Sequence, residues 1–227
     1  MIIYGKQLFL HVLKKYPDKL IEVYLPKQCD QKLFNQIKKT GAIVINVDNK
    51  KAQALAKGGN HQGFLALIED MQLDSFDSVK KGNFLIALDG LSDVGNIGAI
   101  IRSAYIFGAD ALIISGIKSV NIEALMRTSS AAAFELPICL YPNTLDMLHE
   151  LKQIGFGIYG ADMDGEALET IEFTPKKVVV MGSEGEGLSQ KIIEKLDKKI
   201  AIKMARVFDS LNVSAAAAII CNRIANG

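Results

Sequence analysis

The sequence predicts an α/β protein, with a mostly parallel sheet in its larger C-terminal part and a small α/β unit before it. Segments with the spacing of strands alternate with segments that have the spacing of amphipathic helices along all 227 residues. Two strand segments, Phe84–Leu88 and Val178–Met181, are entirely apolar, as strands buried on both faces of a parallel sheet are. Three strand segments also lead into polar loops, which predicts a ligand site at the carboxyl ends of neighbouring strands.

The first part of the chain, residues 1–70, alternates helix and strand three times. Helices are predicted at Gly5–Tyr16, Gln31–Lys39 and Lys50–Lys57, and strands at Ile21–Leu25, Ala42–Val47 and Gly63–Ile68. This order predicts a small three-layer α/β domain. The stretch that follows is polar and acidic without a strong period, so we expect a linker at residues 71–82.

The second part, residues 83–227, is expected to form one further domain. Besides the two apolar strands, strands are predicted at Ala111–Ile114, Ile138–Leu140, Gly157–Gly160 and Lys199–Met204. Helices are predicted at Asn96–Phe107, Ile122–Ser130, Leu145–Gln153, Ser189–Leu196 and Leu211–Ala225. Strand and helix alternate throughout, which favours a parallel sheet.

Charge is distributed unevenly between the two parts. Residues 1–82 contain 13 lysines, no arginine and eight acidic residues, a net charge of +5, whereas residues 83–227 have a net charge of −4. A lysine-rich surface suits loose contacts with nucleic acid phosphates, although lysines that only solvate helix faces explain the same counts. All four arginines lie in the second part, where guanidinium groups suit specific anion positions.

The composition argues against a membrane protein and a metal centre. No apolar run approaches the roughly 20 residues of a membrane-spanning helix, and the first residues lack the layout of a signal peptide. The three cysteines, Cys29, Cys139 and Cys221, are odd in number and lack the spacing of a metal site. We therefore expect a cytoplasmic protein with reduced thiols and without a metal or membrane partner.

The first polar loop leads into a helix that places an arginine above glycines. We expect Asn96 at the helix start, where its side chain can cap free amides. Gly95, Gly98 and Arg102 share one helical face, whereas the isoleucines between them form the apolar stripe. This arrangement leaves room for a bulky anion such as a nucleotide phosphate. A capped surface helix with an arginine that only extends into solvent is the alternative.

The second loop contains glycines at positions 182, 185 and 187 together with Glu184 and Glu186. It lacks the lysine and hydroxyl residue that end a P-loop, and its glutamates would repel phosphate. An acidic glycine loop fits a neutral or cationic ligand better. No G-x-G-x-x-G pattern follows the first strand, so an ordinary dinucleotide fold is not indicated.

These loops together resemble the signature motifs of the SpoU (TrmH-like) RNA ribose 2′-O-methyltransferases of the SPOUT superfamily. The first resembles D-x-x-x-D-x-x-N-x-G-x-x-x-R-(S/T)-A through Asp89, Asp93, Asn96, Gly98, Arg102, Ser103 and Ala104. The second resembles G-x-E-G-x-G-(L/M), and the third resembles S-L-N-V-S at Ser210–Ser214. YGKQLFLHVL and GGNHQGFLALIED (Gly58–Asp70) are similar to the N-terminal RNA-binding domain of the RlmB-like branch, which methylates guanosines of 23S ribosomal RNA.

The resemblance implies a fold, a methyl donor and an assembly. The first domain would be L30e-like, and the parallel sheet of the second would carry a deep trefoil knot, an exception to the rule against knots. S-adenosyl-L-methionine would bind in the knot at Gly182, Ile202 and Leu211. The protein would be a homodimer whose active sites borrow residues from the second subunit.

The functional polar residues of the family match Asn96, Arg102, Glu184, Ser210 and Asn212. The sequence departs from the family pattern at Lys203 and Arg206, where proline and glycine are common, and at Arg127, where lysine is frequent. The first two departures add cationic groups beside the expected donor pocket.

The resemblance implies methyl transfer from S-adenosyl-L-methionine to a ribose 2′-hydroxyl of structured RNA, with a guanosine of 23S rRNA as the expected target. Because guanidinium groups keep their proton in proteins, we expect Arg102 to hold a phosphate rather than to act as the base. A tRNA substrate is one alternative, and a non-catalytic RNA-binding assembly factor is another. The extra basic domain favours ribosomal RNA over tRNA.

Overall fold

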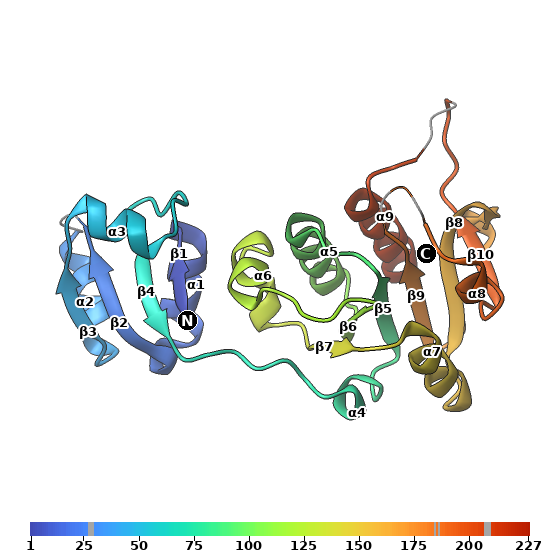
Figure 1. Cartoon of the computed structure of the whole chain (residues 1–227), viewed down its shortest axis with the longest axis horizontal. Helices are drawn as coiled ribbons and strands as arrows, with labels where there is room; N and C mark the ends of the chain where they lie inside the picture. The colour runs from blue at the N-terminus through green and yellow to red at the C-terminus, as the bar shows by residue number, and fades with distance from the viewer. Residues whose placement is uncertain (27–29, 184, 186, 207–209) are drawn as a thin grey trace. The chain divides into compact units, whose positions relative to one another are not determined.

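The computed structural model describes residues 1–26, 30–183, 185, 187–206 and 210–227. The chain divides into two compact units. Unit 1 contains Met1–Gln72 and Ile122–Ala131, and unit 2 contains Leu73–Asn121 and Ala132–Gly227. Helices and strands alternate in both units, which confirms the predicted α/β class (Figure 1).

Unit 1 is built on a four-stranded sheet in the order β1-β4-β2-β3. Its strands are β1 (Ile2–Tyr4), β2 (Leu20–Leu25), β3 (Ile43–Asn46) and β4 (Leu65–Ile68). β2 and β3 are parallel, whereas β4 runs antiparallel to both of its neighbours, β1 and β2. The local sequence pattern does not predict β1, because three residues are too few to show an alternating pattern.

The helices of unit 1 are α1 (Lys6–Lys15), η1 (Pro17–Lys19), α2 (Gln31–Lys39), α3 (Asn49–Leu55) and α6 (Ile122–Thr128). The buried face of α1, within the predicted helix Gly5–Tyr16, is an apolar stripe of Leu8, Phe9, Val12 and Leu13. Asp30 caps α2 by accepting from the Leu33 amide at 2.9 Å. Asp48 caps α3 by accepting from the Lys51 amide at 2.7 Å. These carboxylates satisfy amides that the first turn of a helix leaves open.

Unit 2 contains a six-stranded sheet in the order β10-β8-β9-β5-β6-β7. Its strands are β5 (Phe84–Asp89), β6 (Ala111–Ser115), β7 (Ile138–Tyr141), β8 (Gly157–Ala167), β9 (Lys177–Met181) and β10 (Lys198–Ala201). Every neighbouring pair is parallel, which confirms the predicted sheet. β6 and β7 follow β5 in sequence and lie on one side of it in the sheet, whereas β8, β9 and β10 lie on the other side.

The helices of unit 2 are α4 (Phe76–Val79), α5 (Val94–Ile106), η2 (Ala132–Phe134), α7 (Thr144–Gln153), η3 (Leu168–Thr170), α8 (Gln190–Ile193) and α9 (Val213–Asn226). Leu85 and Ala87 point to one face of β5 and cluster with buried residues of α7 and α8. Ile86 and Leu88 point to the other face and are also fully buried. α5 and α9 pack against each other and cover this second face, so β5 is buried on both faces as predicted.

Several predicted boundaries differ from the structure. The stretch 71–82 contains the short helix α4, which Ser75 caps through the Ser78 amide. β8 extends to Ala167, beyond the predicted Gly160, because its register against β10 shifts and pairing then resumes at Glu166. β10 ends at Ala201 rather than Met204, and α8 ends at Ile193 rather than Leu196. No helix in the described part of the chain is long and apolar enough to cross a membrane.

Candidate active site

The loops after β5 and β9 are neighbours at the carboxyl edge of the unit 2 sheet. β5 and β9 pair in parallel up to Leu88 and Met181, which lie opposite each other where the strands end (Figure 1). The chain continues from β5 to β6 on one side, whereas β10 lies on the far side of β9. Open α/β sheets bind ligands at such a switch point, so the first two motifs meet at a place suited to a ligand.

The start of α5 differs from the prediction. The helix begins at Val94, and its cap is Asp93, whose carboxylate accepts from the Asn96 amide at 2.7 Å. The prediction that Asn96 caps this helix is therefore wrong, because an aspartate three residues earlier already supplies a good acceptor. The Asn96 side chain is left for another role.

Asn96 and Asn212 join the first and third motifs. Asn212 Nδ2 donates to Asn96 Oδ1 at 3.0 Å across 116 positions of sequence. The same Asn212 caps α9, because its Oδ1 accepts from the amides of Ser214 at 2.9 Å and Ala215 at 3.4 Å. One amide side chain thus fixes the start of α9 and ties it to α5. The resemblance matches both asparagines to functional positions, but the sequence gives no sign that they touch.

Arg102 lies on the exposed side of α5. The predicted apolar stripe of Ile97, Ile100, Ile101 and Ala104 is buried, whereas Arg102 is exposed. Its guanidinium group forms no hydrogen bond or ion pair with any residue that the structure describes. Gly98, one turn earlier, is buried. The charge is therefore available to an anionic ligand that approaches this face.

The glycine loop closes tightly on itself. The Gly187 amide donates to the Ser183 carbonyl at 3.1 Å, and the two residues form an isolated bridge. A Cβ atom at Gly182 would overlap the backbone of Gly187, so this position has no room for a side chain. Glu184, predicted in the site, lies outside the described residues.

The third loop follows β10 and carries apolar groups in contact with solvent. Ile202 is half-buried directly after the strand. Met204 and Leu211 are 36% and 40% exposed, and apolar side chains of this size favour contact with a flat apolar ligand surface. Ser210 is exposed and forms no hydrogen bond with another described residue. Lys203 and Arg206, the departures from the family pattern, are exposed in the same loop.

A polar cluster at the end of β5 supports the first loop, and the sequence pattern does not predict this cluster. Thr144 Oγ1, at the start of α7, donates to Asp89 Oδ1 at 2.5 Å and lies 2.8 Å from Ser115 Oγ. The Gly90 amide also donates to the Ser115 carbonyl at 2.9 Å. Asp89 belongs to the first motif, so its position was available from the sequence, but Thr144 lies outside every motif. The cluster fixes the end of β5.

The described cysteines contribute no nucleophile. Burial raises the pKa of Cys139 and of Cys221 to about 12, which suppresses the thiolate form that reacts. Within the described residues, no group of three or more His, Cys, Asp or Glu side chains is placed to hold a metal ion. The described polar groups of the motifs at this edge of the sheet include amide, hydroxyl and guanidinium groups, which position and polarise reactants.

Comparisons with known proteins agree with this geometry. The profile of the SpoU rRNA Methylase family matches residues 83–222. A second profile, described as RNA 2'-O ribose methyltransferase substrate binding, matches residues 2–73.

Relatives and solved structures cover nearly the whole chain. The 23S rRNA (guanosine-2'-O-)-methyltransferase RlmB of Haemophilus influenzae is 33% identical and covers 96% of this chain and 94% of its own length. The RlmB of Pasteurella multocida is 32% identical with the same coverage. The AdoMet-bound rRNA methyltransferase of Sinorhizobium meliloti shares the fold with a TM-score of 0.77 at 23% identity, over 98% of this chain and 85% of its own.

The SpoU methyltransferase AviRb of Streptomyces viridochromogenes, in complex with AdoMet, shares the fold as well. Its TM-score is 0.79 at 21% identity, and the similarity covers 98% of this chain and 88% of that protein. The family profile spans more than half of the chain, and two relatives above 30% identity span almost all of it. The chain therefore belongs to the SpoU rRNA methylase family.

Proposed function

We propose that this protein transfers the methyl group of S-adenosyl-L-methionine to the ribose 2′-hydroxyl of a guanosine in 23S rRNA. The observation that carries the proposal is the Asn212–Asn96 hydrogen bond, which joins two predicted motifs at the switch point of the sheet. The RlmB relatives, named for this reaction, match both units of the chain.

The methyl donor fits the loops after β9 and β10. Gly182 brings no side chain to the loop after β9, because the Gly187 backbone fills the space that a Cβ atom would need, so a ligand at this loop contacts backbone groups. Ile202 and Leu211 offer apolar surface to an adenine ring. We assign these three residues to donor binding. When bound, S-adenosyl-L-methionine supplies an electrophilic methyl group. Glu184 lies outside the described residues, and we assign it to the site from its place in the second motif alone.

Arg102 holds the RNA phosphate beside the target ribose. Its guanidinium group is exposed and has no partner among the described residues, which suits bidentate contact with a phosphate. The proton of the ribose hydroxyl passes to that phosphate or to a water on it, since a guanidinium keeps its own protons. Asn96 orients the ribose or Arg102, while Asn212 and Ser210 shape the third loop. Correct placement of the two reactants supplies much of the acceleration.

Further properties belong to the same proposal. Residues 1–70 serve as an L30e-like RNA-binding domain, residues 71–82 as a linker, and residues 83–227 as the catalytic domain with its trefoil knot. The protein acts in the cytoplasm as a homodimer. Exposed Tyr105 and Ile106 on α5 and Ile219 on α9 support the dimer, because these two packed helices present apolar side chains to solvent.

Two measurements test the function. Purified protein should bind radiolabelled S-adenosyl-L-methionine and transfer label to a 23S rRNA fragment, and the methylated ribose should be lost from a deletion strain. Donor binding without transfer to any RNA would favour the assembly-factor alternative. Transfer to tRNA in preference to the ribosomal fragment would favour the second alternative, a tRNA substrate.

A further inference from the structure

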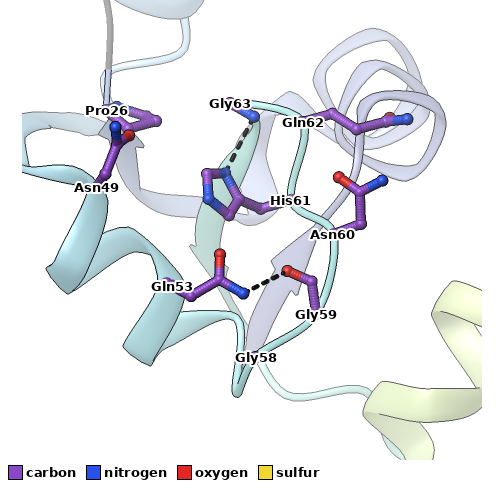
Figure 2. A pocket seen from close by; sticks show the side chains of 9 residues that line it. All are labelled: Pro26, Asn49, Gln53, Gly58, Gly59, Asn60, His61, Gln62 and Gly63. Carbon is purple, nitrogen blue, oxygen red and sulfur yellow. Dashed lines mark hydrogen bonds between the residues drawn. The ribbon is translucent and has the colours of Figure 1, made fainter.

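A pocket of about 480 Å³ opens in unit 1. It lies between α3 and the loop that leads to β4, and Figure 2 shows its side chains. The lining residues are Pro26, Asn49, Gln53, Gly58, Gly59, Asn60, His61, Gln62 and Gly63. None of these nine described residues is charged. The pocket is therefore polar but uncharged, which suits a neutral ligand with hydrogen-bonding edges rather than a phosphate.

Three side chains converge on this space. Gln53 and Asn49 project from α3, and the His61 ring extends toward them from the loop (Figure 2). His61 Nδ1 accepts from the Gly63 amide at 3.0 Å, so in the neutral ring Nε2 carries the hydrogen and is the available donor. Gln53 Nε2 donates to the Gly59 carbonyl at 3.3 Å, which leaves Gln53 Oε1 as an acceptor. The Asn49 side chain has no hydrogen bond to a described residue, so it offers both its carbonyl oxygen and its NH₂ group.

The loop that carries His61 is held in place before any ligand arrives. Lys57 and Gln62 have positive φ angles of 50° and 54°, a conformation that costs energy in residues other than glycine and persists where the surroundings enforce it. The enforcing contacts include the Lys6 amide, which donates to Gln62 Oε1 at 3.2 Å. A Cβ atom at Gly59 would overlap the Tyr4 ring. This rigidity lowers the entropic cost of ordering the pocket on binding.

We propose that this pocket binds one unstacked nucleobase of the RNA substrate. Base edges present adjacent donors and acceptors, which amide and imidazole groups match. Proteins that recognise RNA by sequence take up such bases from single-stranded loops, and histidine is among the residues that stack on them. Lys50 and Lys51, exposed on the same helix as Asn49 and Gln53, contact the flanking phosphates. The proposal rests on the proposed function, because it assigns the pocket to the same RNA.

The test measures RNA binding by full-length Asn49→Ala and Gln53→Leu variants. Each should weaken binding of a 23S rRNA fragment about 5- to 100-fold without changing its salt dependence. Lys50→Gln should reduce the salt slope by about one. Gln36→Leu is the matched control, because Gln36 is also exposed on a helix of unit 1 but outside the pocket. It should bind RNA as the unmodified protein does.

An abasic scan of the RNA identifies the base. Removal of one base should weaken binding by the unmodified protein, and the same removal should have no further effect on Asn49→Ala. If every abasic position weakens Asn49→Ala and the unmodified protein equally, the pocket takes up no base and the proposal is overturned. Methyl transfer by the unmodified protein distinguishes failure of the proposed function from failure of the pocket proposal. If the unmodified protein transfers no methyl group, the proposed function is contradicted. If it transfers normally and the pocket variants bind RNA as tightly as it does, only the pocket proposal is contradicted.

Discussion

The pocket of unit 1 and the carboxyl edge of the unit 2 sheet both carry polar side chains, but they are assembled in different ways. The pocket is closed by contacts within one short segment, such as Gln53 with Gly59 and His61 with Gly63, and by the bond from the Lys6 amide to Gln62. The edge of the unit 2 sheet joins Asn96 to Asn212, and this contact forms only when the complete parallel sheet has placed both loops at one edge. This difference indicates that the two regions have different tasks. The pocket is proposed to bind one base of the RNA, whereas the reactants need the precise positioning that a buried sheet provides.

The largest expected effect tests whether methyl transfer depends on the motif residues at the carboxyl edge of the unit 2 sheet. Arg102→Ala should reduce methyl transfer by about 100- to 1000-fold, because the variant loses one group that contacts charge near the reacting atoms. Its melting temperature and donor affinity should stay nearly unchanged, since Arg102 has no described partner. Single-turnover kinetics and calorimetry measure these quantities.

Arg223→Ala is the control for Arg102→Ala. Arg223 Nη2 donates to the carbonyls of Glu169 and Ile171, so its loss should lower stability rather than transfer. If Arg102→Ala instead lowered the melting temperature as much as Arg223→Ala and retained activity, Arg102 would be structural.

A pair of asparagine variants tests the link between the motifs. Asn212→Ala removes the α9 cap and should cost about 1 kcal/mol of unfolding free energy together with an approximately tenfold loss of transfer. Asn96→Ala should lose transfer without the cost of a cap, because Asp93 caps α5. The double variant, measured in the same assays, should lose less transfer than the product of the two single losses. Strict additivity would show that the hydrogen bond carries no coupling.

Two glycine variants test which unit binds the methyl donor and which unit binds the RNA. Gly182→Ala places a methyl group against the Gly187 backbone, whereas Gly59→Ala places one against the end of the Tyr4 side chain. Gly182→Ala should therefore cost about 1–3 kcal/mol of stability, and Gly59→Ala should cost less. Gly182→Ala should weaken donor binding and leave RNA affinity intact. Gly59→Ala should do the reverse, because its overlap is with Tyr4 beside the pocket. Calorimetric titration with each ligand measures both affinities, and an exchange of the two outcomes would contradict the assignment of ligands to units.

The sequence predicted most of the fold because its patterns are local. Wholly apolar segments such as Phe84–Leu88 identify strands buried on both faces, and the α5 stripe identifies a packed helix. The three-residue strand β1 and the extension of β8 beyond Gly160 were not predicted, because their extent is set by pairing partners that local patterns do not show. The motifs located Asn96, Arg102 and Asn212. They did not show the Asp93 cap, the Asn96–Asn212 contact or the Thr144–Asp89 bond, which depend on residues brought together by topology.

The smallest expected effect concerns a contact that helps to hold the unit 2 sheet in register. Asp197 Oδ1 accepts from Lys152 Nζ at 2.5 Å, and Oδ2 accepts from the Ile158 amide at 2.8 Å. Burial alone would raise the pKa of Asp197, but the bonds to Lys152 and Ile158 prevail and lower it below the usual carboxylate value of 3.8. A folded-state pKa below the unfolded value means that the ionised form stabilises the protein.

That stabilisation is present above the unfolded value of 3.8 and is lost as pH falls through the lower folded pKa. Because the Asp197 side chain is 40% exposed, solvent screens the pair, and Asp197→Asn should cost only about 1 kcal/mol at neutral pH. Lys152→Met, which leaves the Ile158 bond in place, should cost less. Denaturant unfolding at pH 7 and near pH 3 measures both. The gap between the unmodified protein and Asp197→Asn should narrow on acidification, and a gap that widened would reverse the sign of the assigned pKa shift.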